Sequence, residues 1–218
     1  MESVLKENEK MGKKYYTNCK IGYIKKKVYK CLQKKFGFKT WHVDPINFRP
    51  YAINVVETLS RDKIKTMMSD APIVEVGCGL GEIVSNISTK NKKYGYDIEE
   101  SVIQAARIVS PNVMYVNGSF DKISQKDISC LIMVGLTHGL EPIWLQEQIR
   151  NLLNRCNVDM FVIDIIKNRK SIESKKNYPH EQNGDMLFEG KYYLYKRSKG
   201  FQAAGGARRY IEYWAKIN

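Results

Sequence analysis

The chain has 218 residues, of which 43% are hydrophobic and 27% charged, as is ordinary for a globular protein with a substantial core. No stretch approaches the roughly 20 apolar residues that span a bilayer, and the N-terminus lacks the apolar segment of a secretory signal. The five cysteines form no Cys-x-x-Cys pair, which disfavours a zinc site or a disulfide framework. We therefore expect a cytoplasmic protein with free thiols.

The net charge of +13 is concentrated at the two ends of the chain. Residues 1–40 sum to +9, residues 41–166 to −3 and residues 167–218 to +7. Two interpretations are open. The basic ends can bind a polyanion such as RNA, a phosphorylated lipid carrier or an acidic glycan. They can equally be a lysine-rich solvated surface that binds no ligand.

Residues 1–70 are expected to form an N-terminal helical extension and cap. Between Tyr16 and Leu32, apolar residues recur at three- and four-residue intervals, which predicts a helix that Gly37 ends. The segment 41–51 contains two prolines and several aromatic residues, so an ordered loop is expected there. A second helix follows over residues 53–64.

Strands and helices alternate from residue 71 onward. Strands are expected at 73–76, 93–98, 113–116, 128–134 and 160–166, with helices at 82–90, 100–109 and 142–153. This alternation predicts an α/β fold with a mostly parallel sheet and helices on both faces. Residues 128–134 are almost continuously apolar, as in a strand that is buried on both faces.

The C-terminal part of the chain changes character. Residues 167–190 are polar, and a loop or small insertion is expected there. Tyrosine-rich stretches at 192–197 and 209–213, with glycines between them, predict an antiparallel hairpin. Together with the five preceding strands, the hairpin gives a seven-stranded sheet in a domain over residues 71–218.

Three glycines follow the first of these strands and open a helix. In Glu75-Val-Gly77-Cys-Gly79-Leu-Gly81, the missing Cβ atoms let the backbone turn sharply and approach a ligand closely. Ligands of open α/β sheets bind at the carboxyl ends of the strands. The second strand ends in Asp97, where a carboxylate can accept hydrogen bonds from both hydroxyls of a ribose. The pattern therefore predicts a nucleoside site.

The glycine spacing and two acids bear on the kind of nucleoside. A dinucleotide fingerprint is Gly-x-Gly-x-x-Gly, whereas here the third glycine comes one residue early. Glu82 directly follows it and would oppose a pyrophosphate at the helix N-terminus. Glu75, inside the strand, is also easier to explain with a cationic ligand. A sulfonium cofactor that carries an ammonium group fits both acids.

Residues 73–166 resemble the class I S-adenosylmethionine-dependent methyltransferases, and the terminal hairpin is similar to the antiparallel sixth and seventh strands of that family. The resemblance rests on Glu75-x-Gly77-x-Gly79-x-Gly81 together with Asp97. It implies a Rossmann-like fold, S-adenosylmethionine (SAM) as cofactor and methyl transfer as the reaction. It also implies that the cofactor's amino-acid portion is bordered by Glu75, Gly77, Cys78 and Gly79.

The same resemblance assigns the rest of the cofactor. Asp97 would hold the ribose, Ile98 would pack against the adenine, and Gly135, after the fourth strand, would line the pocket near the methionine portion. Many members of the family have an acidic residue after the third strand, but this chain has Ser119 and Phe120 there. Ser119 can still form a hydrogen bond, and Phe120 can stack on the ring or shield it.

His138 is the candidate catalytic residue, because it follows the fourth strand at the edge that faces the cofactor. An imidazole can act as a general base near neutral pH, or it can hydrogen-bond the cofactor or a loop carbonyl, and both roles are open. His42 and His180 lie in segments that are expected to cover the cofactor and shape the acceptor pocket. The three histidines are too scattered to predict a metal site. Asp164 lies within the fifth strand, where it can belong to the acceptor site or be a buried, hydrogen-bonded acid with a structural role only.

The acceptor is less constrained than the cofactor. Residues 41–51 resemble the corresponding block of methyltransferases that are encoded with bacterial surface-polysaccharide enzymes, which implies a sugar hydroxyl and a role in polysaccharide biosynthesis. We therefore favour O-methylation of a small-molecule or glycan hydroxyl. Two alternatives stay open. One is an RNA methyltransferase that binds RNA through its basic N-terminal segment, and the other is a non-catalytic cofactor-binding subunit. The oligomeric state is open as well.

Overall fold

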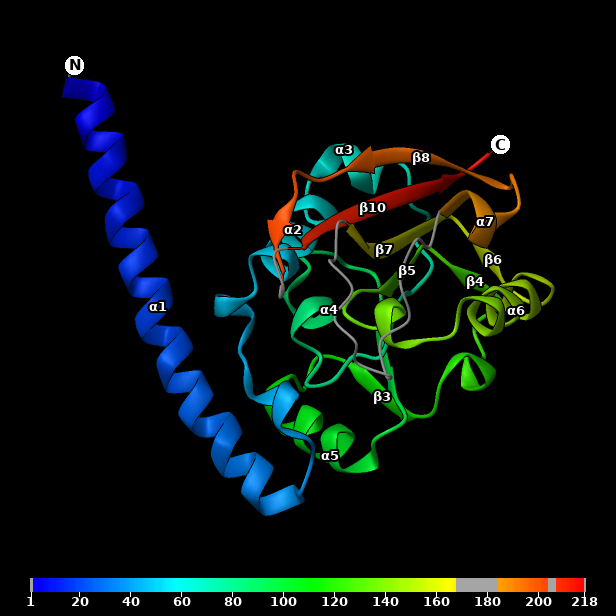
Figure 1. Ribbon diagram of the computed structural model, residues 1–218, viewed down its shortest axis with the longest axis horizontal. Helices are drawn as coiled ribbons and strands as arrows, with labels where there is room; N and C mark the ends of the chain where they lie inside the picture. The colour runs from blue at the N-terminus through cyan, green and yellow to red at the C-terminus, as the bar shows by residue number, and fades with distance from the viewer. Residues whose placement is uncertain (1, 168–183, 204–206, 218) are drawn as a thin grey trace.

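A mixed sheet lies at the centre of the computed structural model, which describes residues 2–167, 184–203 and 207–217 (Figure 1). Seven strands follow the order β3-β2-β1-β5-β7-β10-β8, and β9 pairs with β10. Their bounds are β1 (Ile73–Val76), β2 (Lys93–Asp97), β3 (Met114–Asn117), β5 (Cys130–Met133), β7 (Met160–Lys167), β8 (Tyr192–Arg197), β9 (Phe201–Gln202) and β10 (Arg208–Lys216). A separate parallel pair joins β4 (Asp127–Ile128) to β6 (Asn157–Val158).

The pairing confirms the mostly parallel sheet with an antiparallel hairpin at its end. Strands β3, β2, β1, β5 and β7 are parallel to one another, whereas β10 is antiparallel to both β7 and β8. The last strand, β10, lies between β7 and β8, so the hairpin joins the sheet through its second strand. The strand order reverses between β1 and β5, and the carboxyl ends of these two strands therefore border the expected ligand crevice.

Helices cover both faces of the sheet, as expected. Val74 and Val76 of β1 pack in one buried cluster with α6 (Pro142–Leu153) and α7 (Gly184–Phe188). Ile73 of β1 packs in a second cluster with α2 (Pro50–Leu59) and α4 (Glu82–Asn86). Successive residues of a strand point to opposite faces, which explains why neighbours in β1 serve different clusters. A third cluster joins α5 (Glu100–Val109) to α1 (Glu2–Phe36).

The N-terminal extension begins with the expected helix. Helix α1 ends before Gly37, which has a φ of 79° and donates its N–H to the Gln33 carbonyl at 2.8 Å. The following segment is more regular than the expected loop, because it forms the 3-10 turns η1 (Thr40–Val43) and η2 (Ile46–Phe48). Pro50 then starts α2 as its first residue, and the short α3 (Asp62–Lys65) completes the extension.

Several expected elements are shorter or divided in the structure. The helix expected over residues 53–64 is divided into α2 and α3. Helix α4 ends at Asn86, where the chain turns to the extended conformation and Ser88 N–H donates to the Ser60 hydroxyl at 2.9 Å. The apolar run 128–134 is divided at Ser129, whose N–H donates to the Pro72 carbonyl at 2.9 Å. Its two parts pair with different strands, a distinction that the apolar pattern does not contain.

No helix in the described part of the chain combines the length and apolar character needed to cross a bilayer. The longest, α1, has 35 residues and is rich in lysine. Most of the polar segment expected at 167–190 lies outside the described residues, apart from α7 and the residues that directly follow it.

Candidate cofactor and acceptor site

The loop between β1 and α4 is built on three glycines in the left-handed region. Gly77, Gly79 and Gly81 have φ angles of 70°, 54° and 71°, which residues with a Cβ adopt only at an energetic cost. Gly77 N–H donates to the Tyr96 carbonyl at 2.8 Å and ties the loop to β2. A Cβ on Gly81 would lie 2.0 Å from the Tyr115 hydroxyl. The glycines therefore let the chain turn in the space that the neighbouring strands leave.

Asp97, at the carboxyl end of β2, connects this loop to the next one. Its Oδ2 accepts the N–H of Gly79 at 2.9 Å, and its Oδ1 accepts the N–H of Glu99 at 3.0 Å. The side chain is 7% exposed. Each carboxylate oxygen has two acceptor positions, so an oxygen that holds one backbone N–H can still accept a hydroxyl. The residue suits the ribose role assigned to it from the sequence.

Glu75 lies under the same loop, completely buried in β1. Its Oε2 accepts the N–H of Val84 at 3.1 Å. Burial raises the pKa of the Glu75 carboxyl to about 8, although the Val84 N–H and the charge of Arg49 act in the opposite direction. The carboxyl is therefore mostly neutral at pH 7. A cationic group beside it would stabilise its ionised form, so this position fits the ammonium of a cofactor.

Glu82 has a different role from the one inferred from the sequence. Its Oε1 accepts the hydroxyl of Tyr29 at 2.7 Å and an N–H of Lys25 at 3.2 Å. Its Oε2 accepts the N–H of Ile46 at 2.8 Å and an N–H of Arg49 at 2.9 Å. The carboxylate is thus saturated by the N-terminal extension. Contrary to the expectation from the sequence, Glu82 therefore gives no indication of a cationic ligand.

His42, in η1, brings the extension onto the glycine loop. Its Nδ1 lies 2.8 Å from the position that a Cβ on Gly79 would take. Its Nε2 lies 3.5 Å from Oε2 of Glu99. Burial lowers the pKa of His42, although the negative charges of Asp97 and Glu99 act in the opposite direction. The sequence placed His42 in a segment that covers the cofactor, and the His42–Glu99 pair was not foreseen.

The fourth- and fifth-strand residues of the sequence prediction meet around Asp164, which is buried in β7. Its Oδ1 accepts the Gly135 N–H at 3.0 Å and the Thr137 hydroxyl at 3.1 Å. Its Oδ2 faces His138 Nδ1 at 3.7 Å. Burial alone would raise the pKa of Asp164, but His138, the charge of Arg209 and the Gly135 N–H outweigh it and lower that pKa. Asp164 is therefore an ionised acid behind the imidazole.

Arg209, in β10, completes this cluster and was missed in the sequence. Its Nε lies 3.4 Å from Asp164 Oδ2, on the same oxygen that faces His138. Its guanidinium lies over the ring of Tyr51 at 4.2 Å from the centroid. The stacking brings α2 of the extension to the edge of the sheet that carries His138. The sequence signal for Arg209 is an arginine within a tyrosine-rich strand. That signal does not identify a site residue, because arginines are also common on the exposed faces of strands.

The predicted adenine contacts differ in exposure. Ile98 is 77% exposed, so its apolar side chain is open to a planar ligand. Phe120 is 1% exposed and packs edge-on against Trp144, with ring centroids 6.2 Å apart. Its ring therefore lies in the core and is not an open stacking surface. Ser119 is half-buried beside it, and Cys78 is buried, with its thiol pKa well above the ordinary value because of burial.

Gly135 has a φ of 81°, and a Cβ there would meet nothing within 4 Å, which leaves its surface open to a ligand. Within the described ranges, no cluster of three or more His, Cys, Asp and Glu residues has the geometry of a metal site. His180 lies outside the described residues.

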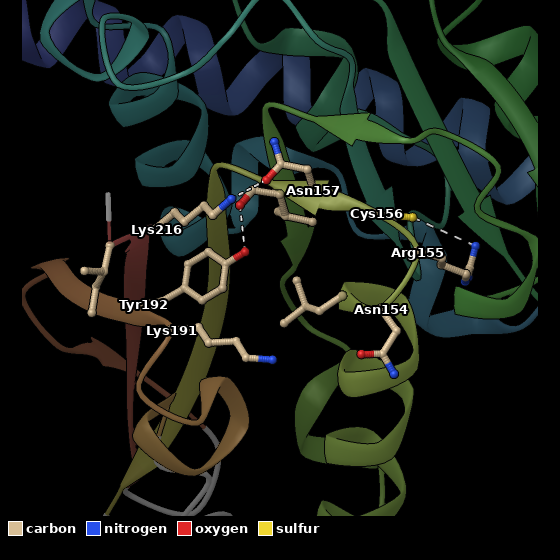
Figure 2. Close-up of a pocket in the computed structure, with 10 residues that line it drawn as sticks. Asn154, Arg155, Cys156, Asn157, Lys191, Tyr192 and Lys216 are labelled. Atoms are coloured by element: carbon tan, nitrogen blue, oxygen red, sulfur yellow. Dashed lines mark hydrogen bonds between the residues drawn. The ribbon is translucent and has the colours of Figure 1, made fainter.

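A cavity of about 480 Å³ lies at the opposite edge of the sheet (Figure 2). It is bordered by residues that precede β7 and by the start of β8, among them Asn154 and Lys191. Lys216 donates to the Asn157 side chain at 2.5 Å, and the Tyr192 hydroxyl donates to the Val158 carbonyl at 2.7 Å. The glycine loop and His138 follow the carboxyl ends of β1 and β5, so this cavity is not the candidate site.

The sheet order, the glycine loop and Asp97 together give this chain the fold of the class I SAM-dependent methyltransferases. The N-methyltransferase NodS from Bradyrhizobium japonicum, in complex with S-adenosylhomocysteine, has a TM-score of 0.64 at 13% identity over 87% of this chain and 98% of that chain. Magnesium protoporphyrin IX methyltransferase from Synechocystis, with bound SAM, has a TM-score of 0.58 at 11% identity over 91% and 97%.

A TehB-like SAM-dependent methyltransferase from Corynebacterium glutamicum has a TM-score of 0.51 at 16% identity, over 76% of this chain and 87% of that chain. No protein-family model and no curated protein matches the sequence. At these identities, the likeness concerns the fold alone.

Proposed function

We propose that this chain is a SAM-dependent methyltransferase. The observation that carries the proposal is the double hydrogen bonding of Asp97, which fixes the glycine loop and leaves acceptor positions for a ribose. Residues 71–218 would form the catalytic domain, with residues 1–70 as its cap. We assign the cofactor contacts to Glu75, Gly77, Cys78, Gly79, Asp97, Ile98, Ser119, Phe120 and Gly135.

Three features of the site suit this cofactor, and the first of them disfavours a dinucleotide. The buried Glu75 favours a ligand with a positive charge beside it, as SAM has and a pyrophosphate lacks. The exposed side chain of Ile98 suits an adenine ring. The open backbone at Gly135 lies between the glycine loop and Asp164, where the methionine portion would run. Bound SAM would supply a methyl group that its sulfonium makes electrophilic.

His138 would accept the proton of the acceptor. Asp164 faces Nδ1 of the imidazole, so Nε2, on the other side of the ring, would take the proton of the acceptor. The ionised Asp164 would stabilise the imidazolium that forms, and Arg209 would hold the carboxylate in place. A positioned base of this kind contributes typically about 10²–10⁴-fold to the rate. Methyl transfer itself then needs mainly orientation of the two reactants.

We infer that the acceptor is a hydroxyl, on a small molecule or a glycan. A hydroxyl must lose its proton as the methyl group arrives, and the His138–Asp164 pair is suited to remove it. One of the similar structures is named as a porphyrin methyltransferase and another as an N-methyltransferase. Because the two names differ in the acceptor, they favour neither oxygen nor nitrogen as the methylated atom here.

Calorimetry with S-adenosylhomocysteine, followed by transfer assays with radiolabelled SAM, tests the proposal. We expect saturable binding that NAD does not compete with, and transfer of label to a hydroxylated compound in a panel that also contains amines and RNA. Absence of saturable binding would contradict the cofactor assignment. Binding without transfer to any acceptor class would favour a non-catalytic subunit, and labelling of RNA would favour the alternative enzyme.

A further inference from the structure

Helix α1 exposes apolar side chains on the face that points away from the domain. Ile21, Ile24 and Val28 are 43%, 65% and 49% exposed. Their spacing of three and four residues places them along one face of the helix. We call these three residues the outer stripe. Figure 1 shows that α1 runs along the outside of the molecule and that its N-terminal half extends clear of the remaining elements.

The opposite face of α1 is fastened to the domain, so the outer stripe cannot turn inward. A Cβ on Gly22 would lie 2.9 Å from Asn47 and Phe48, which shows how closely the helix approaches η2. About two turns further, the Tyr29 hydroxyl donates to the buried Glu82 at 2.7 Å. Rotation of the helix would break this contact and the one from Lys25, and would leave Oε1 of the buried Glu82 without its donors.

Lysines border the outer stripe. Residues 10–43 contain eleven lysines and no acidic residue. Lys20, Lys27, Lys34 and Lys35 are all exposed in the same part of the helix as the stripe. Beyond the helix, Trp41 is 65% exposed, with the Lys39 ammonium 4.8 Å from its ring. Exposed apolar side chains flanked by lysines and followed by a tryptophan are typical of surfaces that lie in the headgroup region of a membrane.

The charges and the apolar side chains together select one occupant for this face. A second copy of the chain would bring lysine-rich helix edges against each other. RNA would pair with the lysines but would leave the exposed isoleucines without a contact. An anionic lipid surface offers negative headgroups to the lysines and acyl chains to the stripe.

We propose that α1 binds the surface of an anionic lipid bilayer, with the outer stripe inserted among the lipids and the flanking lysines at the headgroups. The catalytic domain stays outside the bilayer, fastened to α1 through Tyr29 and Glu82. This binding does not depend on the proposed methyl transfer and needs neither cofactor nor acceptor.

Co-sedimentation of the full chain with vesicles tests the proposal. Vesicles of phosphatidylglycerol and phosphatidylcholine in equal parts should bind the protein, and vesicles of phosphatidylcholine alone should bind it at least about tenfold more weakly. Ile24→Asp should lower the partition onto the anionic vesicles by at least about tenfold. Ile108→Asp is the matched control, since Ile108 is 56% exposed on α5 and does not belong to the outer stripe, and this substitution changes charge and hydrophobicity equally.

Each other outcome overturns the proposal in a distinct way. Equal binding by Ile24→Asp and Ile108→Asp would show that the lysines act without insertion of the stripe. A lipid-free dimer in sedimentation velocity that Ile24→Asp dissociates would make a second copy the occupant. Binding of an RNA oligonucleotide without binding of anionic vesicles would make RNA the occupant. Calorimetry with S-adenosylhomocysteine on the same variants reads the cofactor site separately, so the two proposals can fail independently.

Discussion

His138 Nδ1 lies 3.7 Å from Asp164 Oδ2, which joins a histidine after β5 to a carboxylate buried in β7. The distance exceeds that of a formed hydrogen bond. Catalytic hydrogen bonds are often long before substrate binds, and they tighten in the reacting complex. This pairing strengthens the case for His138 as a general base, because a carboxylate at this place can orient the imidazole ring and stabilise its protonated form.

Replacing His138 by Ala should slow methyl transfer by about 10²–10⁴-fold if it is the general base. The affinity for S-adenosylhomocysteine should stay near that of the unmodified protein, because the side chain faces Asp164 and the acceptor side. Single-turnover rates with labelled SAM, together with calorimetry, measure both quantities. An unaltered rate would limit His138 to a structural role.

Asp164→Asn should destabilise the protein by about 3 kcal/mol at pH 7, because it leaves the largely buried Arg209 without the carboxylate that it faces. The pKa of Asp164 is lowered on folding, so its contribution is present above the unfolded value near 3.9 and is lost as the pH falls through the folded value. Urea denaturation at decreasing pH should therefore show the two proteins converging in acid. A difference that is independent of pH would refute the assigned charge state.

Asp97→Asn should weaken binding of S-adenosylhomocysteine by about 1–3 kcal/mol. An amide offers one acceptor oxygen where the carboxylate offers two, and here both oxygens already accept backbone N–H groups. Asp121→Asn is a suitable control, because that carboxylate is an exposed acid in a neighbouring loop. Unchanged affinity in calorimetry would exclude the ribose contact.

Glu82→Gln should cost about 3 kcal/mol of unfolding free energy, since four donors from the N-terminal extension lose a buried carboxylate. Glu100→Gln is the matched control, because the Glu100 side chain is 50% exposed and should change stability by no more than about 0.5 kcal/mol. Limited proteolysis should also cut the extension faster in Glu82→Gln. Equal urea midpoints for the two variants would show that Glu82 does not hold the extension.

Cofactor binding near pH 7 should release close to one proton from Glu75. The pKa of this carboxyl is about 8, so it is mostly protonated, and a neighbouring ammonium would lower that pKa and drive the proton off. Calorimetry in buffers of different ionisation heat measures the release, and Glu75→Gln subtracts any proton exchange by the ligand itself. No difference between the two proteins would place the ammonium away from Glu75.

The elements from residue 71 onward were predictable because their signals are local. The glycine spacing before α4, the apolar run of β1 and the acid at the end of β2 lie close together in the chain, and parallel topology then brings their ends to one edge. The division of the run at Ser129 was not predictable, because it depends on a hydrogen bond to Pro72, which is distant in the chain.

Glu82 shows why a local argument about charge can fail. In the sequence, Glu82 directly follows the glycine loop, so a ligand bound at that loop is the partner to expect. In the structure, Tyr29 and Arg49 reach it from segments that no periodicity connects to α4. A buried carboxylate requires donors, and only the packing of the extension identifies which ones they are.

The strands of the sheet, the glycine loop and the position of Asp97 follow from the sequence, because backbone conformation and strand alternation depend on near neighbours. Only the folded structure shows that Asp164 and Arg209 stand behind His138, that His42 covers Gly79, and that one face of α1 is exposed. These relationships join residues from distant segments, and their energies come from burial and charge pairing, which exist only once the chain has folded.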